Sequence, residues 1–300
     1  GYDDTWSIKG ADVFEAETLC VKTRNMGQIS TWGVNNLSFL SRAATVTTPI
    51  RQNPRPDVAF NASRTYVSLV VGDGDSFKHL QGRNLQWSQQ RVATCQRDPS
   101  PRSCFPLSWT LSPHLLHVAP DMLHYFLNQS YITKQDFFLL PPSGHLYAYP
   151  ALMPAEQQQE YARQTERDAT LLNTSGTVDW EMLGTWELAE HFFEYYANNS
   201  VVRGIFPLNV PFMVPMAIFP PGKFFKVLGA DCVLFRPRSW RGNTTSTLPF
   251  SRQEYLTAKE MAAELNGHPP GTVSWIYVLE RKRGGGGGGG GGGGRGGEGG

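Results

Sequence analysis

The sequence lacks the features that mark several large classes of protein. Its formal net charge is only +1 over 300 residues, and no long run of Lys and Arg stands out. Nothing in the charge therefore favours binding to nucleic acid. No apolar run is long enough to span a membrane, because prolines interrupt the most apolar passage, at 206–221. We expect neither a nucleic-acid partner nor a membrane span in this chain.

Several catalytic and ligand-binding motifs are absent as well. The sequence has no P-loop, no nucleophile elbow, and no GxGxxG fingerprint outside its glycine-rich end. It has no CxxC or CxxH spacing, so we expect no structural zinc site and assign no metal or cofactor. Cys95 and Cys104 flank a short loop rich in Pro, Arg and Ser. A disulfide that closes this loop is predicted if the compartment is oxidising.

The chain is predicted to form one domain over residues 1–283, followed by a disordered tail. The tail, residues 284–300, is almost pure glycine and cannot bury apolar surface. The sequence opens on Gly1 rather than on an initiator Met, so we expect an N-terminal part to be missing. A secretory or extracellular setting is predicted from six glycosylation sequons, at Asn36, Asn61, Asn128, Asn173, Asn198 and Asn243.

Strand patterns alternate with helix patterns along most of the chain. Strands are predicted at 28–31, 66–71, 106–111, 136–140, 177–183, 201–206, 231–235 and 272–279. Helices are predicted at 11–26, 76–94, 113–127, 155–172, 187–198 and 251–265. This rhythm is typical of βαβ units and a parallel sheet. About seven or eight such units fit a (β/α)8, TIM-barrel-like domain. A doubly wound open sheet is the alternative, and periodicity alone does not separate the two.

The segment Tyr66–Ser76 is the first candidate for a functional site. Its apolar strand ends in Gly72-Asp73-Gly74-Asp75, at the carboxyl end where α/β folds place their chemistry. Positions two apart on an extended segment point the same way, so Asp73 and Asp75 are predicted to face one cleft. Like charges held close together raise one pKa, which lets a pair divide into acid and base. The alternative is an Asx-type turn in which both carboxylates bind local amides.

The loop Ser143–Pro150 is the second candidate. Tyr147 and Tyr149 would form a rigid wall there, and aromatic faces of this kind pack against sugar rings. Trp109, near a predicted strand end, is assigned to the same wall, and His145 is a candidate general acid. The alternative for these side chains is a structural one, in which the aromatics cover the end of the domain.

Glycoside hydrolysis also needs a second carboxylate about 5–9.5 Å from the first. Glu181, near the end of a predicted strand, is the candidate. Arg236 could orient a carboxylate or a uronic acid, or it could form a surface ion pair.

Four short blocks of the chain together resemble the GxGYxYP family of putative glycoside hydrolases. The segment Gly144–Pro150, GHLYAYP, matches the motif that names the family, except that Leu146 stands where the second Gly is expected. Gly72–Ser76 is similar to the family's S-D-G-D-N stretch, and Pro106–Pro113 to its P-x-x-W-x-x-x-P segment. Asn36, in an N-L-S block near the start, is assigned with them to the sugar site. These blocks occur in the family's order.

The resemblance implies a barrel-like catalytic domain that acts on sugars outside the cytoplasm, and an N-terminal companion domain. The first hypothesis is a secreted glycoside hydrolase in which Asp73, Asp75 and Glu181 supply the acid and base chemistry. The second is a carbohydrate-binding relic of the same fold without activity. The third is a metal-dependent hydrolase, such as a deacetylase, that uses the two aspartates as ligands.

Overall fold

The structure is a computed structural model that describes residues 37–42, 44–56, 58–181, 186–197, 200–209, 226–228, 232–235, 238–241 and 258–278. The helix predicted at 11–26, the strand predicted at 28–31, Asn36, Arg236 and the glycine-rich tail lie outside these residues. No helix in the described part of the chain is long and apolar enough to cross a bilayer.

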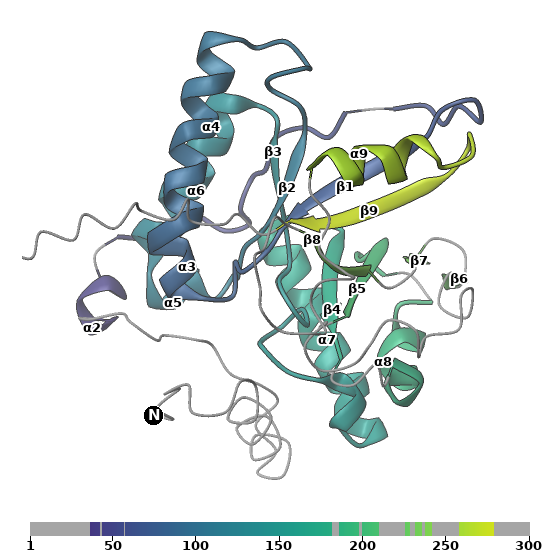
Figure 1. Cartoon of the computed structure of the whole chain (residues 1–300). Helices are drawn as coiled ribbons and strands as arrows, with labels where there is room; N and C mark the ends of the chain where they lie inside the picture. Colours follow the sequence, from purple (N-terminus) through teal and green to yellow (C-terminus); the bar gives the residue numbers. More distant parts are fainter. Residues whose placement is uncertain are drawn as a thin grey trace, which may run out of the picture.

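Strands and helices alternate along the chain, as the sequence predicts (Figure 1). The strands are β1 (Tyr66–Val71), β2 (Leu107–Thr110), β3 (Asp136–Leu139), β4 (Gly176–Trp180), β5 (Gly204–Asn209), β6 (Lys226–Leu228), β7 (Cys232–Leu234), β8 (Arg238–Arg241) and β9 (Val273–Val278). The longer helices are α4 (Leu85–Arg97), α6 (Pro120–Thr133), α7 (Ala155–Leu172) and α9 (Ala258–Asn266). The short ones are α2 (Leu37–Leu40), α3 (Phe77–His79), η1 (Leu80–Asn84), α5 (Leu115–Val118), η2 (Pro150–Leu152), η4 (Trp186–Ala189) and α8 (Glu190–Tyr195).

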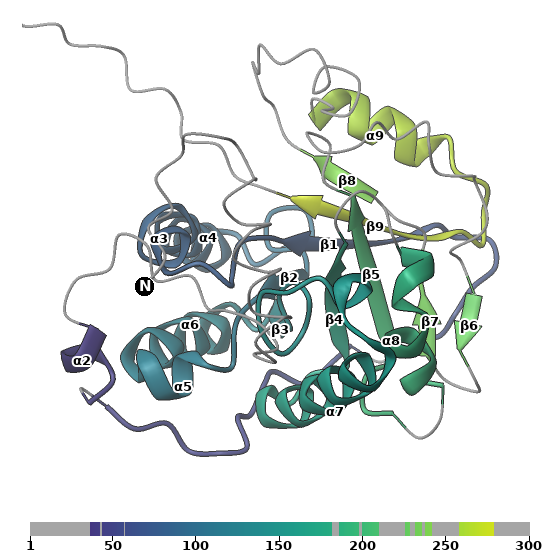
Figure 2. The ribbon, with the colours of Figure 1, turned by 90° about the horizontal axis from the view of Figure 1, so that it is seen from below.

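The parallel ladders connect into a closed path. β1 lies between β2 and β9, β2 pairs with β3, β9 with β8, β8 with β5, and β5 with β4. A bridge then joins β3 to β4, since the Leu140 amide donates to the Gly176 carbonyl at 3.0 Å and the Val178 amide to the Leu140 carbonyl at 3.0 Å. Figure 2 shows the helices around the outside of these strands.

The α/β class with a parallel sheet is therefore confirmed. The described residues do not form eight complete βα units, and β6 pairs antiparallel with β7. β8 was missed because its four residues, RSWR, include two arginines rather than an apolar run.

The strands bury side chains on both of their faces, which explains the nearly unbroken apolar sequence of β1. An inner cluster contains Val70, Tyr149, Trp180 and Tyr277 and takes its strand residues from β1, β4, β5 and β9. The neighbouring Val71 belongs instead to an outer cluster between strands and helices. The alternation of strand side chains places successive residues in these two layers.

The helix predicted at 113–127, with Pro120 as an irregularity near its start, forms two helices that are divided at Ala119. α5 ends there with backbone angles of φ −158° and ψ 66°, and Pro120 begins α6. Proline lacks the amide hydrogen that an interior helical position needs, so it is favoured at the first position of a helix instead.

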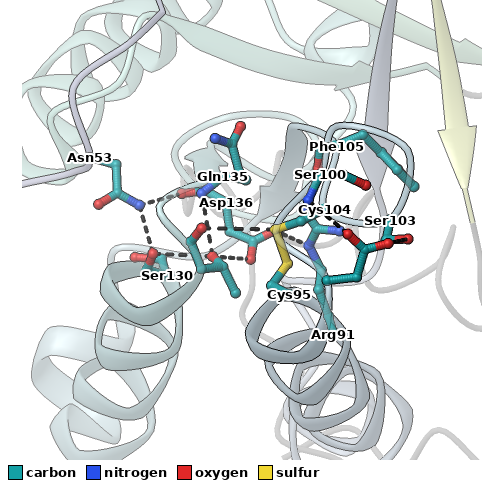
Figure 3. Close-up of a disulfide and its surroundings, with 12 residues drawn as sticks. Asn53, Arg91, Cys95, Ser100, Ser103, Cys104, Phe105, Ser130, Gln135 and Asp136 are labelled. Atoms are coloured by element: carbon teal, nitrogen blue, oxygen red, sulfur yellow. Dashed lines mark hydrogen bonds and ion pairs between the residues drawn. A yellow bond between two sulfur atoms is a disulfide. The ribbon is translucent and has the colours of Figure 1, made fainter.

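A buried polar network holds β3 to the surrounding helices (Figure 3). Asp136 receives hydrogen bonds from Arg91 Nε at 2.5 Å, from the Trp109 indole at 3.0 Å and from the Thr133 hydroxyl at 2.5 Å. The predicted disulfide between Cys95 and Cys104 is present beside this network, which confirms the pairing. These contacts lie where β3 begins, at the opposite end from the acidic turn.

Candidate functional site

The acidic turn that follows β1 is not extended. Asp73 has a left-handed backbone with φ of 62°. The rule that residues two apart point the same way holds for an extended segment, so it does not support the prediction that Asp73 and Asp75 face one cleft. The Asp73 carboxylate pairs with the Arg83 guanidinium from η1, and its amide donates to the Tyr277 hydroxyl at 3.2 Å. Its charge is thus already neutralised by a neighbour.

Gly74 fixes this turn against the end of β2. Its amide donates to Thr110 Oγ1 at 2.9 Å, and its carbonyl accepts from the Ser112 amide at 3.1 Å. A Cβ at Gly74 would lie 1.7 Å from the Thr110 carbonyl oxygen. The approach of two backbones requires glycine here for reasons of space. The turn therefore has a fixed position at the carboxyl ends of β1 and β2.

Asp75 is half-buried, and its charge acts on Tyr277 of the inner cluster. Burial raises the pKa of its carboxyl from 3.8 to about 6, although a bond from its own amide opposes the change. Burial, and then the charge of Asp75, raise the pKa of the Tyr277 hydroxyl well above its ordinary value. A carboxyl that holds its proton close to neutral pH can act as a general acid.

The loop that follows β3 is held by hydrogen bonds that each join a main-chain group to a side-chain hydroxyl. The Ser143 hydroxyl donates to the Trp180 carbonyl at 3.0 Å and accepts from the Trp180 amide at 2.8 Å. The His145 amide donates to the Thr165 hydroxyl at 3.1 Å. Leu146, the departure from the family motif, donates its amide to the Tyr161 hydroxyl at 3.0 Å. Both tyrosines of the motif are therefore carried by an anchored loop.

The tyrosines form one aromatic group with Trp180. The Tyr147 ring lies 5.2 Å from Trp180 and 6.1 Å from Tyr149, centroid to centroid. Tyr149 is buried in the inner cluster with Tyr277, whereas Tyr147 packs against that cluster and stays half-exposed. Because Tyr277 also contacts the acidic turn, the structure brings the two sequence candidates to the same cluster.

Glu181 follows β4 and is buried beneath η2. Its two carboxyl oxygens face the Ala151 amide, at 3.0 and 3.1 Å. Burial and then the charge of Asp179 raise the pKa of Glu181 well above its ordinary value, and the bond from Ala151 opposes them. The protonated form of Glu181 is therefore favoured more than it would be in water.

The structure places Trp109 apart from the aromatic group of the loop. It belongs to the outer cluster, and its ring centroid lies 5.1 Å from that of Trp87 on α4. With Ser88, Phe126 and Asp136 it lines a small cavity between the strands and the helices. Trp109 is thus buried between the strands and the helices rather than in the aromatic group of the loop.

His145 lies in a cluster that sequence reasoning missed. Its Nδ1 is 2.7 Å from Asp168 Oδ2, and His114 Nε2 is 3.2 Å from the same oxygen. Burial raises the pKa of Asp168, but the hydrogen bonds from His114 and His145 outweigh it and the net pKa is lowered. Within the described residues, this is the group of three side chains whose ligand atoms lie close enough to hold a metal. No short motif connects residues this far apart, so no signal in the sequence could have found them.

Comparisons with known proteins address the fold and the family. A search of curated proteins found no match. Among solved structures, the chain is similar to a putative hydrolase from Bacteroides thetaiotaomicron, with a TM-score of 0.56 and 20% sequence identity. The match covers 82% of this chain and 44% of that protein, so the chain spans less than half of its length. At this identity the likeness shows the fold alone.

The family comparison is more specific. The model of the family described as "GxGYxYP putative glycoside hydrolase C-terminal domain" matches residues 63–212. This range covers the acidic turn, the tyrosine loop and the His114, His145 and Asp168 cluster, and it is half of the 300 residues. The chain therefore belongs to the GxGYxYP putative glycoside hydrolase family, through that family's C-terminal domain.

Proposed function

We propose that this domain acts on carbohydrate as a glycoside hydrolase, with Asp75 as its proton donor and the closed path of parallel ladders as its barrel. The observation that carries the proposal is the position of Asp75. Its carboxyl lies at the carboxyl end of β1, beside Tyr277 and the aromatic inner cluster, with a pKa raised to about 6. Barrels of parallel strands place their catalytic side chains at this edge, the carboxyl ends of the strands.

The proposed chemistry follows from the protonation state of Asp75. As the glycosidic bond breaks, Asp75 gives a proton to the leaving oxygen, while a water molecule adds to the anomeric carbon and loses its own proton to solvent. An acid with a pKa of about 6 is partly protonated near neutral pH and gives the proton up readily. Tyr147, the half-exposed member of the aromatic group, would pack against a sugar ring, and Tyr149 would support it from beneath.

The other two predicted carboxylates take supporting roles in this proposal. Asp73 positions the turn, because its charge is used in the pair with Arg83. Glu181 is buried and accepts the Ala151 amide, and we propose that it holds η2, and through it Tyr149, in place. The alternative in which Asp73 and Asp75 both bind a metal is disfavoured, since a guanidinium already occupies the position beside Asp73.

The test separates a proton donor from a structural aspartate. Asp75→Asn should lower cleavage of natural glycans by about 10²–10⁴-fold. The same variant should cleave dinitrophenyl glycosides at close to the wild-type rate, because that leaving group departs without a proton. Asp73→Asn, the matched control, should affect both substrate types alike. Wild-type cleavage of natural glycans by Asp75→Asn would remove the assignment.

A second candidate is carbohydrate binding without cleavage. It is favoured by the observation that Asp73 is ion-paired and Glu181 is covered, so two of the three predicted catalytic carboxylates are committed elsewhere. Calorimetry with a glycan panel distinguishes the two candidates. A sugar that binds in a Tyr147-dependent manner and stays intact would favour binding alone.

We also propose a secretory setting for the domain. The support is the Cys95–Cys104 disulfide and the exposed sequon residues Asn61, Asn128 and Asn173. Expression in a secreting eukaryotic host, followed by treatment with a glycosidase that removes N-linked chains, tests it. A mass that does not change on treatment would contradict the proposal.

A further inference from the structure

Three possible metal ligands meet at one point between neighbouring elements. His114 leads from β2 into α5, His145 lies on the loop after β3, and Asp168 is on α7. The distances are 3.3 Å between His114 Nε2 and His145 Nδ1, 2.7 Å between His145 Nδ1 and Asp168 Oδ2, and 3.2 Å between His114 Nε2 and Asp168 Oδ2. The two loops leave the carboxyl ends of adjacent parallel strands, the edge at which α/β folds bind ligands.

Hydrogen bonds alone do not account for this triangle. A neutral imidazole nitrogen either donates or accepts. If both ring nitrogens donate to Asp168 Oδ2, neither can accept from the other, so the contact between His114 and His145 is left without a bond. A single cation placed between the three atoms would accept all three lone pairs at once.

The size of the triangle fits a small divalent cation. Zn²⁺ binds imidazole nitrogen and carboxylate oxygen at about 2.0–2.2 Å in tetrahedral geometry, which puts neighbouring ligand atoms about 3.3 Å apart. Two of the three observed separations, 3.3 and 3.2 Å, agree with this value, and the third, 2.7 Å, is shorter by about half an ångström. Only a small adjustment of the His145 and Asp168 side chains would complete the geometry.

The ligands are positioned by the fold and remain reachable. The side chains of His114, His145 and Asp168 are 23, 16 and 12% exposed. The His145 amide is bound to Thr165, one turn before Asp168 on the same helix, which fixes the two residues relative to each other. Sites held on rigid elements in this way need little reorganisation to bind.

We propose that His114 Nε2, His145 Nδ1 and Asp168 Oδ2 bind a Zn²⁺-type divalent cation, with the fourth position taken by water or an external ligand. Two imidazoles favour a borderline metal such as zinc over Mg²⁺ or Ca²⁺, which prefer oxygen ligands. The site does not depend on the proposed sugar chemistry. Its consequence is local, because an ion there would join the connection between β2 and α5, the helix α7 and the loop that carries Tyr147 and Tyr149.

The experiment uses the full chain without a polyhistidine tag, stripped of metal with a chelator. Calorimetric titration with Zn²⁺ should give one equivalent bound, and Co²⁺ should give the visible absorption of a four-coordinate ion. His145→Ala and Asp168→Asn should each weaken Zn²⁺ binding at least 10-fold. Mg²⁺ should not compete.

The matched control is His117→Ala. His117 is exposed, and its ring centroid lies 6.5 Å from that of His114, outside the triangle. This variant should bind Zn²⁺ as the wild type does, and far-UV circular dichroism should show that every variant is folded. The proposal is overturned if the wild type binds no stoichiometric Zn²⁺, or if folded Asp168→Asn and His145→Ala bind it unchanged. It is also overturned if His117→Ala weakens binding as much as they do.

Discussion

Asp75→Asn is expected to stabilise the folded chain at neutral pH while it removes the proposed proton donor. Burial raises the pKa of the Asp75 carboxyl from 3.8 to about 6. At neutral pH the carboxyl is ionised in both the folded and the unfolded chain, but the charge is less favourable in the folded one. Each pKa unit corresponds to 1.36 kcal/mol, so the ionised Asp75 lowers the free energy of unfolding by about 3 kcal/mol. An uncharged amide of the same shape avoids this penalty.

The stabilisation should depend on pH with a defined sign. The Asp75 carboxyl ionises near pH ~4 in the unfolded chain, whereas in the folded chain it ionises near pH 6. Between these values unfolding releases a proton, so the stability of the wild type falls as the pH rises. Asp75→Asn has no such group and should not show this loss. The variant should therefore resemble the wild type near pH ~4 and exceed it by up to about 3 kcal/mol at pH ~7.

Urea denaturation at both pH values measures this difference directly. Asp121→Asn is the control, because Asp121 is an exposed carboxylate in the first turn of α6 and should give no gain at neutral pH. A gain for Asp75→Asn that is equal at the two pH values would refute the reasoning. So would a variant that is less stable than the wild type at neutral pH. Stability gained while activity is lost is the pattern expected of a functional side chain.

Two further predictions concern the scaffold that holds the site. Gly74→Ala should destabilise the protein by about 1–3 kcal/mol or more, because its Cβ would meet the Thr110 carbonyl oxygen at 1.7 Å. Gly82→Ala is the control and should be neutral or slightly stabilising, because the space around Gly82 is open. Thermal melts compare the two variants. Asp136→Ala should cost about 3–5 kcal/mol, since it leaves the buried Arg91 guanidinium without its ion partner. The exposed pair of Arg163 with Glu160 is the control, and Glu160→Ala should change the free energy of unfolding by less than about 1 kcal/mol.

The fold class could be read from the sequence because burial on two faces leaves a local pattern. β1 reads as a continuous apolar run since Val70 enters the inner cluster and Val71 the outer one. α7 was predicted with its observed bounds, because no proline or glycine interrupts its pattern. The strands β6 and β8 were not predicted, since neither carries a long apolar run. β6 is a three-residue strand paired with the neighbouring β7, and β8 pairs with the distant β9.

The candidate site was predicted in part. The acidic turn and the tyrosine loop carry local motifs, and both lie at the inner cluster through Tyr277 and Tyr149. The different environments of Asp73 and Asp75 could not be predicted, because they depend on Arg83 and Tyr277, which approach from other parts of the chain.

The sequence by itself determined the alternation of strands and helices, the disulfide and the two motif-bearing loops, because each depends on residues close together in the chain. The tertiary structure alone decided that burial raises the pKa of Asp75 and that Arg83 neutralises the charge of Asp73. It also decided that Trp109 packs among helices, and that His114 and Asp168 join His145 at one point. The reason is that burial and charge act through space, and a chain brings distant residues together only when it folds.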